Sequence, residues 1–551
     1  MIKNLLNKVK KINQTMLGFT LIELLAVIVI LAIITLIATP IILGIINNTK
    51  EQSNKRSIEM YAKAVENAIT EYQLKVNDKP TSFQQIENYI KLNGSDVKCK
   101  TSILYEDGTF YLNKCEVNNV LVEGYIYGNL KTYVDEFGVS INVPTGLTPV
   151  IYKNGNWEIV SHKSKWFDYN NQEWANAVIL NEDVSKDVGT KIYPSGDKTN
   201  IKAMFVYVPR YEYKIEGEYG MHTDGTVGTQ ALPGEIKVNF IPKSQTNASN
   251  DYIIHPAFKF GDKQLEGIWV GKFEVSHSEQ SKSGTPLGCI DENCEKADDL
   301  RILPNVKSLR NNNMSNFFYG IRSMSRKENG FGIVDDTHII KNSEWGAIAY
   351  LSQSKYGKYG NSNYTGANKE IYQNKSKYIT GMSNGTPSVD TFRNSEGGQT
   401  ADISTSVQCS YDATVDNCGI GASTTGNITG IYDMSGGSFD RSMGIKLDDN
   451  LNLILGSSEF GDLISIEQKY YETYTTYGIN DIGQSLSETS VSGSSNTSWY
   501  NDDSRFITRT QTWFNRGGYY KDEIVVGVFN YSLCVGGSSS QASTRVVLVE
   551  D

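Results

Sequence analysis

The feature that most constrains this chain of 551 residues is an apolar run near its N-terminus. Residues 24–46 contain no charged side chain, and roughly 20 apolar residues suffice for a helix to cross the hydrocarbon layer of a bilayer. The residues before Phe19 are basic and polar, and the run is far longer than the apolar part of a cleavable secretory signal. This pattern predicts a hydrophobic helix over residues 19–48 that crosses a membrane once.

A single carboxylate, Glu23, stands at the start of this run. A charged side chain inside an apolar helix costs on the order of 2.5 kcal/mol or more unless a partner neutralises it. A buried carboxylate and a buried ammonium each offset part of the other's desolvation penalty. The sequence therefore predicts a cationic partner for Glu23, and the alternative is a plain single-span anchor whose Glu23 lies at the membrane interface.

The residues Gly18-Phe19-Thr20-Leu21-Ile22-Glu23 resemble the N-terminal methylation signal of type IV pilins and pseudopilins. In that family a prepilin peptidase cuts after the glycine, the new terminal Phe is N-methylated, and the glutamate pairs with the amino group of a neighbouring subunit. The resemblance implies a leader over residues 1–18, processing at Gly18 and Phe19, and assembly through Phe19 and Glu23. The implied partners are the prepilin peptidase, other pilin subunits and the membrane.

An amphipathic helix and a small antiparallel sheet are expected next, as a pilin head over residues 49–143. Residues 102–105, 109–112 and 120–127 alternate as strands do. The helix is expected to end at Pro80 and to pack one face on the sheet. Its apolar positions recur at three- and four-residue steps: Ile58, Tyr61, Ala62, Val65, Ala68, Ile69 and Tyr72.

Six of the seven cysteines fall into pairs with short separations. We expect three disulfide bonds formed outside the cytoplasm: Cys99–Cys115, Cys289–Cys294 and Cys409–Cys418. No pair has the spacing of a zinc site, and the five histidines are scattered, so a structural zinc is not expected. Cys534 is left over, and it either pairs between chains or is simply a buried thiol.

The composition favours an exposed protein rich in strands and loops, since 33 tyrosines and 49 glycines accompany only 12 prolines. Acidic side chains number 62 against 52 basic ones, for a net charge of −10. The predicted leader holds Lys3, Lys8, Lys10 and Lys11 and no acid, so its removal takes the net charge to −14. This balance argues against nucleic acid as a partner.

A second architecture is expected after the head. The Pro/Gly/Thr-containing passage at 144–149 predicts a linker, within a linker and connecting segment over residues 144–200. Three of the seven tryptophans lie between Trp157 and Trp174. They fit either a small β module or the edge of the next core, and we favour the second interpretation.

Several sequence motifs in the remaining chain occur in the same order as in one known family. They comprise strands at 204–209 and 267–275, a helix with a Glu-Trp pair at 341–351, an Asp-Met-Ser-Gly turn within 430–437, and final strands at 513–518 and 545–548. The set resembles the formylglycine-generating-enzyme-like branch of the C-type lectin fold, which implies a C-type-lectin-like domain over residues 201–551. The predicted fold class is therefore α+β: a long N-terminal hydrophobic helix, a pilin head with a small antiparallel sheet, and this large domain.

The residues that carry catalysis in that family are missing. Its enzymes bind copper through two cysteines a few residues apart, whereas only Cys534 follows Gly518 here. A triad of His338, Asp336 and Ser343 can be written on paper, but such spacing is an ordinary surface pattern. We therefore expect no enzyme activity and no cofactor.

Calcium is the single candidate ion. The family's asparagine after Met-Ser-Gly is replaced by Gly437, which weakens the family's calcium site. Asn427 and Asp433 are the remaining candidate ligands, since calcium takes oxygen ligands.

The last fifty residues predict a ligand-binding face. An apolar frame, which includes Trp513, Arg516-Gly517-Gly518 and Arg545-Val546-Val547-Leu548, reads as buried strand. The intervening residues have the composition of an antibody-like recognition loop: Tyr519, Tyr520, Asp522, Tyr531, Ser532, Ser538, Ser539 and Ser540. This arrangement also resembles the variable region of proteins diversified by retroelements, and the alternative is a polar terminal loop without a partner.

These resemblances predict a type IV pilin-like minor or tip subunit, because so large a head would crowd a filament at every position. Its expected function is adhesion or recognition of an unknown ligand on a cell, phage or host surface. The expected location is a single-pass membrane protein before assembly and then the pilus at the cell surface. The alternatives are a DNA-uptake or secretion pseudopilin and a formylglycine-generating-enzyme-like oxidase.

Overall fold

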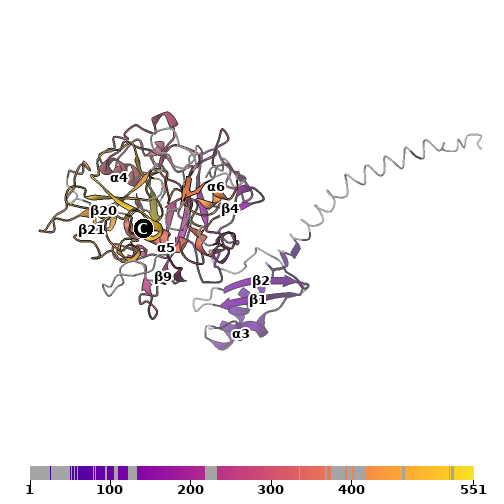
Figure 1. The fold of residues 1–551 in the computed structure, drawn as a ribbon. Helices are drawn as coiled ribbons and strands as arrows, with labels where there is room; N and C mark the ends of the chain where they lie inside the picture. The colour runs from indigo at the N-terminus through magenta and orange to yellow at the C-terminus, as the bar shows by residue number, and fades with distance from the viewer. Residues whose placement is uncertain are drawn as a thin grey trace, which may run out of the picture. The chain divides into compact units, whose positions relative to one another are not determined.

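The computed structural model divides the chain into two compact units, Met1–Leu130 and Lys131–Asp551 (Figure 1). The described residues are 25, 50, 53–92, 96–104, 110–121, 133–216, 233–333, 336–365, 369–373, 391–393, 400–402, 416–461, 466–519, 522 and 526–550, without 55, 59, 79, 81, 93–95 and 495.

In the first unit, a helix that includes residues 60–76 packs on a three-stranded antiparallel sheet. Apolar side chains of the helix, among them Val65 and Ile69, share a core with Phe110 and Leu112 of the sheet. The predicted amphipathic helix and hairpin are thereby confirmed. The remaining elements are α3 (Phe83–Ile86), η1 (Glu87–Tyr89), β1 (Val97–Leu104), β2 (Phe110–Val117) and β3 (Val120–Leu121).

The predicted fold class is wrong in its helical part. The described helices are short and the strands mostly antiparallel, so the described chain is mainly β and has no long hydrophobic helix. The helix at 60–76 carries charged side chains such as Lys63 and Glu71, and α5 (Asn342–Ser352) has 11 residues, about half of what a bilayer requires.

The predicted location as a single-pass membrane protein is also wrong, because the described helices do not meet the requirement for a membrane span. No helix within the described part of the chain is long and apolar enough to cross a membrane. The predicted leader (1–18) and hydrophobic helix (19–48) lie outside the described residues, apart from Leu25.

An eight-stranded sheet, antiparallel throughout, organises the second unit. Its order is β17 (Asp336–Ile339), β25 (Val546–Val549), β14 (Gly267–Gly271), β8 (Ile201–Pro209), β6 (Asn176–Leu180), β4 (Thr148–Lys153), β5 (Asn156–Ile159) and β7 (Lys191–Ile192). The segment 144–200, for which we predicted a linker, thus contributes four strands. Its tryptophans belong to the core as expected, because Trp166 stacks on Trp269 of β14 with ring centroids 6.2 Å apart.

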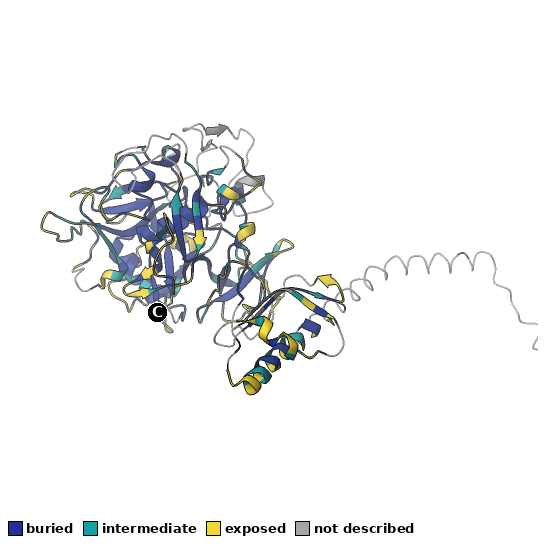
Figure 2. Ribbon diagram, turned by 90° about the horizontal axis from the view of Figure 1, so that it is seen from below, coloured by how far each residue is buried: buried dark blue, intermediate teal, exposed yellow. Residues whose placement is uncertain are grey.

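A five-stranded sheet carries the C-terminal loops. β20 (Phe439–Lys446) pairs with β21 (Glu472–Tyr474), β22 (Trp513–Arg516) and β24 (Ala542–Thr544), and β23 (Tyr531–Cys534) pairs with β22. The strands predicted at 204–209, 267–275, 513–518 and 545–548 correspond to β8, β14, β22 and β25, and the helix predicted at 341–351 is α5. Figure 2 shows that these interior strands are buried.

Shorter elements complete the second unit. The strands are β9 (Tyr211–Ile215), β10 (Ile236–Phe240), β11 (Ile253–Ile254), β12 (Lys259–Phe260), β13 (Lys263–Gln264), β15 (Ser276–His277), β16 (Leu300–Arg301), β18 (Thr391–Arg393) and β19 (Thr400–Asp402). The helices are η2 (Tyr169–Asn171), η3 (Pro256–Phe258), η4 (Gln280–Lys282), η5 (Ala297–Asp299), α4 (Met314–Ser323), η6 (Lys358–Gly360), α6 (Asp416–Gly421), η9 (Gln468–Tyr470), η10 (Ser487–Thr489) and η11 (Trp499–Asn501).

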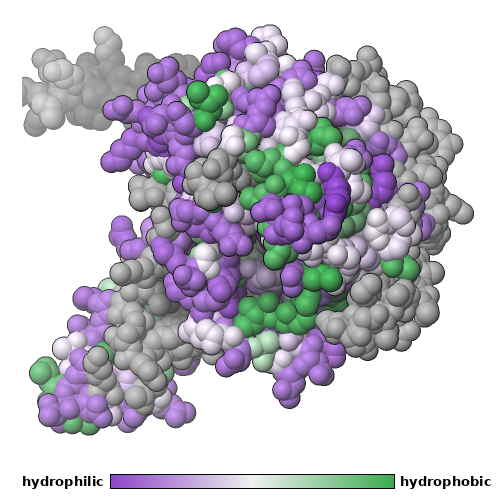
Figure 3. All heavy atoms as spheres, turned by 90° about the vertical axis from the view of Figure 1, so that its left-hand side faces the viewer, coloured by the Kyte–Doolittle hydropathy of each residue, from purple (hydrophilic) through white to green (hydrophobic). Residues whose placement is uncertain are grey.

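Some apolar side chains of the second unit remain exposed. Leu451 follows β20, Ile479 and Ile482 follow β21, and Val535 follows β23. Figure 3 shows the side of the molecule near the β20 and β21 labels of Figure 1, where hydrophobic groups gather among hydrophilic ones.

Two of the three predicted disulfides are present, Cys99–Cys115 and Cys289–Cys294. The first joins directly opposed residues of β1 and β2. Cys409 lies outside the described residues, so its pairing with Cys418 stays a prediction.

Candidate ligand-binding site

Three strands of the five-stranded sheet meet at the beginning of β20. Asp440 lies opposite Arg516 of β22 on one side and opposite Ser543 of β24 on the other. The backbone N–H of Phe439 donates to the carbonyl of Gln541 at 2.9 Å. Both loops that the sequence predicted as a binding face therefore begin or end beside Phe439.

The exit from β22 is a glycine turn. Gly517 and Gly518 have φ angles of 75° and 70°, in the left-handed region where glycine is favoured. A Cβ on Gly517 would lie 3.1 Å from the Trp345 ring. The two glycines thus turn the chain sharply, directly against the core.

A buried ion pair fixes the start of β20. The Nε and Nη2 atoms of Arg545 donate to Asp440 Oδ2 at 3.1 and 2.9 Å, and Nη1 donates to the carbonyl of Gly271 at 2.8 Å. Both charged side chains are essentially inaccessible to solvent. Breaking such a pair leaves an uncompensated buried charge, so it holds three strands in one arrangement.

A second buried guanidinium fixes the end of β22. Arg516 donates to the carbonyls of Gln484 and Ser485 at 3.2 and 3.1 Å and lies over the rings of Trp345 and Tyr531. Burial lowers the pKa of Arg516 to about 10. The predicted frame residues Trp513, Arg516 and 545–548 are all buried, as their sequence suggested.

An aromatic pair stands on this frame. The rings of Phe439 and Tyr519 have centroids 5.1 Å apart, and both side chains are half-buried. Asp522 accepts a hydrogen bond from the backbone N–H of Tyr519 at 3.2 Å. Burial raises the pKa of Asp522 to about 6, although its hydrogen bond to the Tyr519 N–H acts in the opposite direction.

A serine loop lies on the other side of Phe439, at residues 538–540. Ser538 is exposed, and Ser539 and Ser540 are half-buried. The backbone N–H of Asn311 donates to the Ser539 carbonyl at 2.8 Å.

The buried guanidinium of Arg441 anchors the beginning of this loop. It donates to the carbonyls of Gly536 and Gly537, and also to that of Asn312 at 3.0 Å. The serine loop is therefore fixed by hydrogen bonds to its backbone carbonyls, and the Ser539 hydroxyl accepts from the Gln541 N–H at 3.1 Å.

We call Phe439, Tyr519, Asp522, Ser538, Ser539, Ser540 and Gln541 the recognition face. Sequence reasoning missed Phe439 and the exposed Gln541. A signal for Phe439 existed, because it closely follows the Asp-Met-Ser-Gly turn that the sequence analysis singled out.

Two predicted binding residues do not belong to this face, and a third is not described. Tyr531 is fully buried and Ser532 is 3% exposed, because β23 pairs them with Arg516 and Asn515 of β22. Tyr531 packs in a core cluster with residues such as Phe506 and Phe514. Tyr520 lies outside the described residues.

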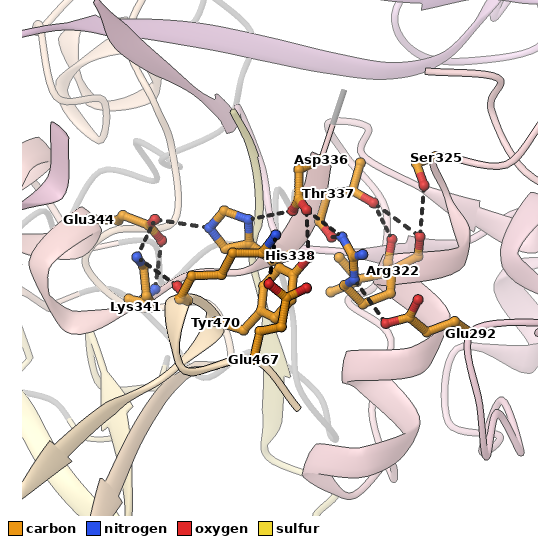
Figure 4. Close-up of polar contacts among 12 residues, drawn as sticks. Glu292, Arg322, Ser325, Asp336, Thr337, His338, Lys341, Glu344, Glu467 and Tyr470 are labelled. Atoms are coloured by element: carbon orange, nitrogen blue, oxygen red, sulfur yellow. Dashed lines mark hydrogen bonds and ion pairs between the residues drawn. The ribbon is translucent and has the colours of Figure 1, made fainter. Parts of the chain in front are cut away.

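His338 occupies a second polar cluster (Figure 4). Its Nδ1 lies 3.2 Å from Asp336 Oδ1 and its Nε2 lies 2.9 Å from Glu344 Oε1. Burial alone would lower its pKa, but the two carboxylates raise the pKa of His338 above its usual value. The ring is fully buried and stacks on Phe260 at 4.9 Å.

The partners of this cluster are themselves satisfied. Arg322 and Tyr470 hold Asp336 at 2.8 and 2.6 Å, and the Lys341 ammonium lies 3.4 Å from Glu344. Buried polar networks with every member paired rigidify a core.

The hypothetical triad of His338, Asp336 and Ser343 does not form. No hydrogen bond of the described residues joins Ser343 to His338, and the Ser343 N–H donates to Glu472 instead. The cluster therefore lacks an adjacent nucleophile.

Of the two candidate calcium ligands, Asn427 is hydrogen-bonded to Thr429 and Asp433 is buried. The Asn427 side-chain oxygen accepts from the N–H and hydroxyl of Thr429 at 2.9 and 2.7 Å, and Asp433 is buried. Within the described residues, no group of three or more His, Cys, Asp or Glu side chains could hold a metal ion. Calcium binding stays an untested prediction.

The remaining predicted sites are the processing residues and Cys534. Gly18, Phe19 and Glu23 lie outside the described residues. Cys534 is half-buried on β23 and forms no disulfide with a described cysteine. Burial raises the pKa of its thiol, although the nearby Arg441 acts in the opposite direction.

Comparison with known proteins gives little. No family model matches the chain, and no curated protein does. Among solved structures, one match is the Treponema denticola variable protein 1, with 11% identity, 64% of this chain and 98% of that chain covered, and a TM-score of 0.25. So low a TM-score establishes no shared fold, and we draw nothing from it.

Proposed function

We propose that this chain is a recognition protein whose second unit binds a ligand on another cell, a phage or a host surface through the recognition face. The observation that carries this proposal is the contrast between a fully buried frame, held by Arg441, Arg516 and Arg545, and the half-exposed Phe439–Tyr519 pair that stands on it.

The chemistry of the face suits binding. Aromatic side chains give large contact area at low cost in conformational entropy, and serines give adaptable hydrogen bonds. The serine loop is already held by Arg441 and by the Asn311 N–H, so it loses little entropy on binding, which favours affinity. Asp522 adds one acidic group, whose carboxylate accepts from the Tyr519 backbone N–H.

Variation of this face between strains is the finer part of the proposal. Side chains on the serine loop can change without loss of the frame, because the buried Arg441 holds the backbone carbonyls of Gly536 and Gly537. Sequencing of the same locus in sister strains should find substitutions concentrated at 519–541 outside β23. An even spread of substitutions through β22 and β25 would contradict this.

The presentation of the face as part of a pilin-like subunit remains a prediction from the resemblance at Gly18, Phe19 and Glu23. Catalysis is not proposed. The chain lacks the family's cysteine pair after Gly518, and His338 has no adjacent nucleophile among the described residues.

Binding of the purified full-length protein to a glycan array and to whole cells tests the proposal. Truncation of a central aromatic side chain at an interface typically costs about 2 kcal/mol, which is roughly 30-fold in affinity. Tyr519→Ala should therefore weaken binding by about this factor. The control Tyr193→Ala removes an exposed tyrosine of the same unit and should leave binding unchanged; equal binding by wild type and Tyr519→Ala would refute the proposal.

A further inference from the structure

Arg505 lies at the same end of the five-stranded sheet as the recognition face. Its backbone N–H donates to the carbonyl of Tyr531 at 2.9 Å, and the Tyr531 N–H donates to the carbonyl of Asp503 at 2.9 Å. Tyr531 in turn lies opposite Arg516 of β22, and the chain reaches Tyr519 three residues later. The sheet therefore brings Arg505 to the edge of the recognition face.

A buried carboxylate orients the Arg505 side chain. Its Nε atom lies 2.7 Å from Asp503 Oδ2, and Asp503 is only 5% exposed. The arginine side chain is 52% exposed, and its Nη1 and Nη2 atoms donate to no described residue. Because the ion pair already holds the guanidinium, a ligand that meets the Nη atoms causes little further loss of side-chain entropy.

Asp522 of the recognition face lies close to this ion pair. Burial raises the pKa of Asp522 to about 6, Asp503 acts in the same direction, and Arg505 acts in the opposite one. The Tyr519 N–H, which donates to Asp522 Oδ2 at 3.2 Å, also lowers this pKa. Charged groups act on a pKa in this way at short range, so the guanidinium and the half-buried Asp522 are neighbours at one edge of the face.

We propose that the recognition face takes a ligand that carries a carboxylate, and that Arg505 binds this group through its Nη atoms. The inference rests on the proposed function, because it names the chemistry of the ligand at the same face. A planar guanidinium matches a carboxylate with two parallel hydrogen bonds, and arginine is enriched among the residues that dominate binding energy. Acidic sugars and the acidic side chains of a protein both supply this group.

The neighbouring acid makes such binding depend on pH. An ionised Asp522 repels a ligand carboxylate held at Arg505, and protonation of Asp522 removes that repulsion. The charged groups that act on Asp522 are Asp503 and Arg505, which remain paired with each other. Affinity should therefore rise as the pH falls from about 7.5 to about 5, through the pKa of Asp522.

Binding of the purified full-length protein to polymer-linked probes tests this assignment. Glucuronate and N-acetylneuraminate represent acidic sugars, and a glutamate-rich peptide represents an acidic protein segment. The amides of both sugars and a glutamine-rich peptide are the controls, since they have the same shape and no carboxylate. At least one acidic probe should bind, more tightly at the lower pH, and its control should not; the probe that binds identifies the source of the carboxylate.

Two variants test the residues. Arg505→Lys keeps the charge and can still pair with Asp503, but it loses the planar fork. A hydrogen bond to a charged group typically contributes tenfold or more in affinity, so about a tenfold loss is expected without a change in thermal unfolding. Asp522→Asn keeps an acceptor for the Tyr519 N–H, and at the higher pH it should bind as tightly as the wild type does at the lower pH.

Arg509→Lys is the matched control. Arg509 is also an exposed arginine paired with an aspartate, Asp449, but it precedes β22 and lies at the opposite end of the sheet. This variant should bind the acidic probe as the wild type does.

The outcomes separate this inference from the proposed function. If Tyr519→Ala weakens binding to cells and Arg505→Lys does not, the carboxylate assignment is wrong and the proposed function stands. If neither variant alters binding, both are wrong. Binding of no acidic probe, equal binding of the amides, or wild-type affinity that is the same at both pH values would also overturn the assignment.

Discussion

Tyr519 and Tyr531 occur in the same C-terminal stretch but have opposite surroundings. Tyr519 is half-buried beside Phe439, whereas Tyr531 is fully buried in a cluster with Phe514. From composition alone, both tyrosines were predicted to bind a ligand. The difference arises from the pairing of β23 with β22, which no local pattern specifies.

Alanine at these two positions should therefore separate folding from binding. Large-to-small changes at buried aromatic residues cost about 3–5 kcal/mol, so Tyr531→Ala should lower the free energy of unfolding by this amount. Tyr519→Ala should lower it by less than about 1 kcal/mol. Urea unfolding of both variants checks the contrast, and a similar loss for both would place Tyr519 in the core.

Glu488 is a buried acidic residue of the second unit. Its carboxylate accepts from the hydroxyls of Tyr213 and Tyr350 at 2.8 and 3.0 Å and from the Gly483 N–H. Burial raises the pKa of Glu488 to about 7, although these hydrogen bonds act in the opposite direction. The folded chain therefore binds this proton more tightly than the unfolded chain does.

Binding of this proton by Glu488 should add to the free energy of unfolding. The contribution should be fully present below a pH of about 4.5 and lost as the pH rises to about 7. Each pKa unit corresponds to about 1.4 kcal/mol, so the loss is roughly 3 kcal/mol. Glu488→Gln should lack this component. The difference in unfolding free energy between wild type and Glu488→Gln, measured from pH 4.5 to 8, should change across that window; a constant difference would contradict the assignment.

At the scale of elements, strong local patterns were predicted well. The apolar strands β8, β14 and β25 and the Trp-bearing helix α5 lie where their sequences indicated. The segment 144–200, predicted as a linker and connecting segment, contributes β4, β5, β6 and β7 to the sheet, although its prolines and glycines resemble a linker. β4 pairs with β6, and β6 with β8, only after the chain has folded back.

The candidate site was predicted in part for the same reason. Tyr519, Asp522 and the serines 538–540 could be found from composition. Phe439 reaches them only through the pairing of β20 with β22 and β24, across about a hundred residues of chain.

Processing at the N-terminus is a prediction for a single element, the leader at 1–18. The junction of Gly18 and Phe19, with Glu23 following, predicts a mature chain that begins at N-methylated Phe19. Mass spectrometry of the protein from its native cells should find this terminus, and Gly18→Asp should leave the leader attached. An intact leader on the native protein would contradict the prediction.

For the molecule as a whole, the buried frame and the proposed recognition face are different parts of the second unit. Buried arginines pair with carbonyls and with Asp440 inside the sheet, so they fix the backbone independently of the loop side chains. The half-buried Phe439 and Tyr519 and the serines 538–540 lie at the edge of that frame. Under the proposed function, substitutions in the recognition face would change its specificity while the fold stays constant.

Hydrogen exchange of the full-length protein, with and without a bound cell-surface ligand, tests this account most directly. We expect ligand-dependent protection in the peptides that contain Phe439, Tyr519 and Ser538–Gln541, because their backbone lies beneath the contact. The strands β4, β5 and β7 should exchange at unchanged rates. Protection confined to those strands or to the first unit, with none around Phe439 and Tyr519, would contradict the assignment of the recognition face.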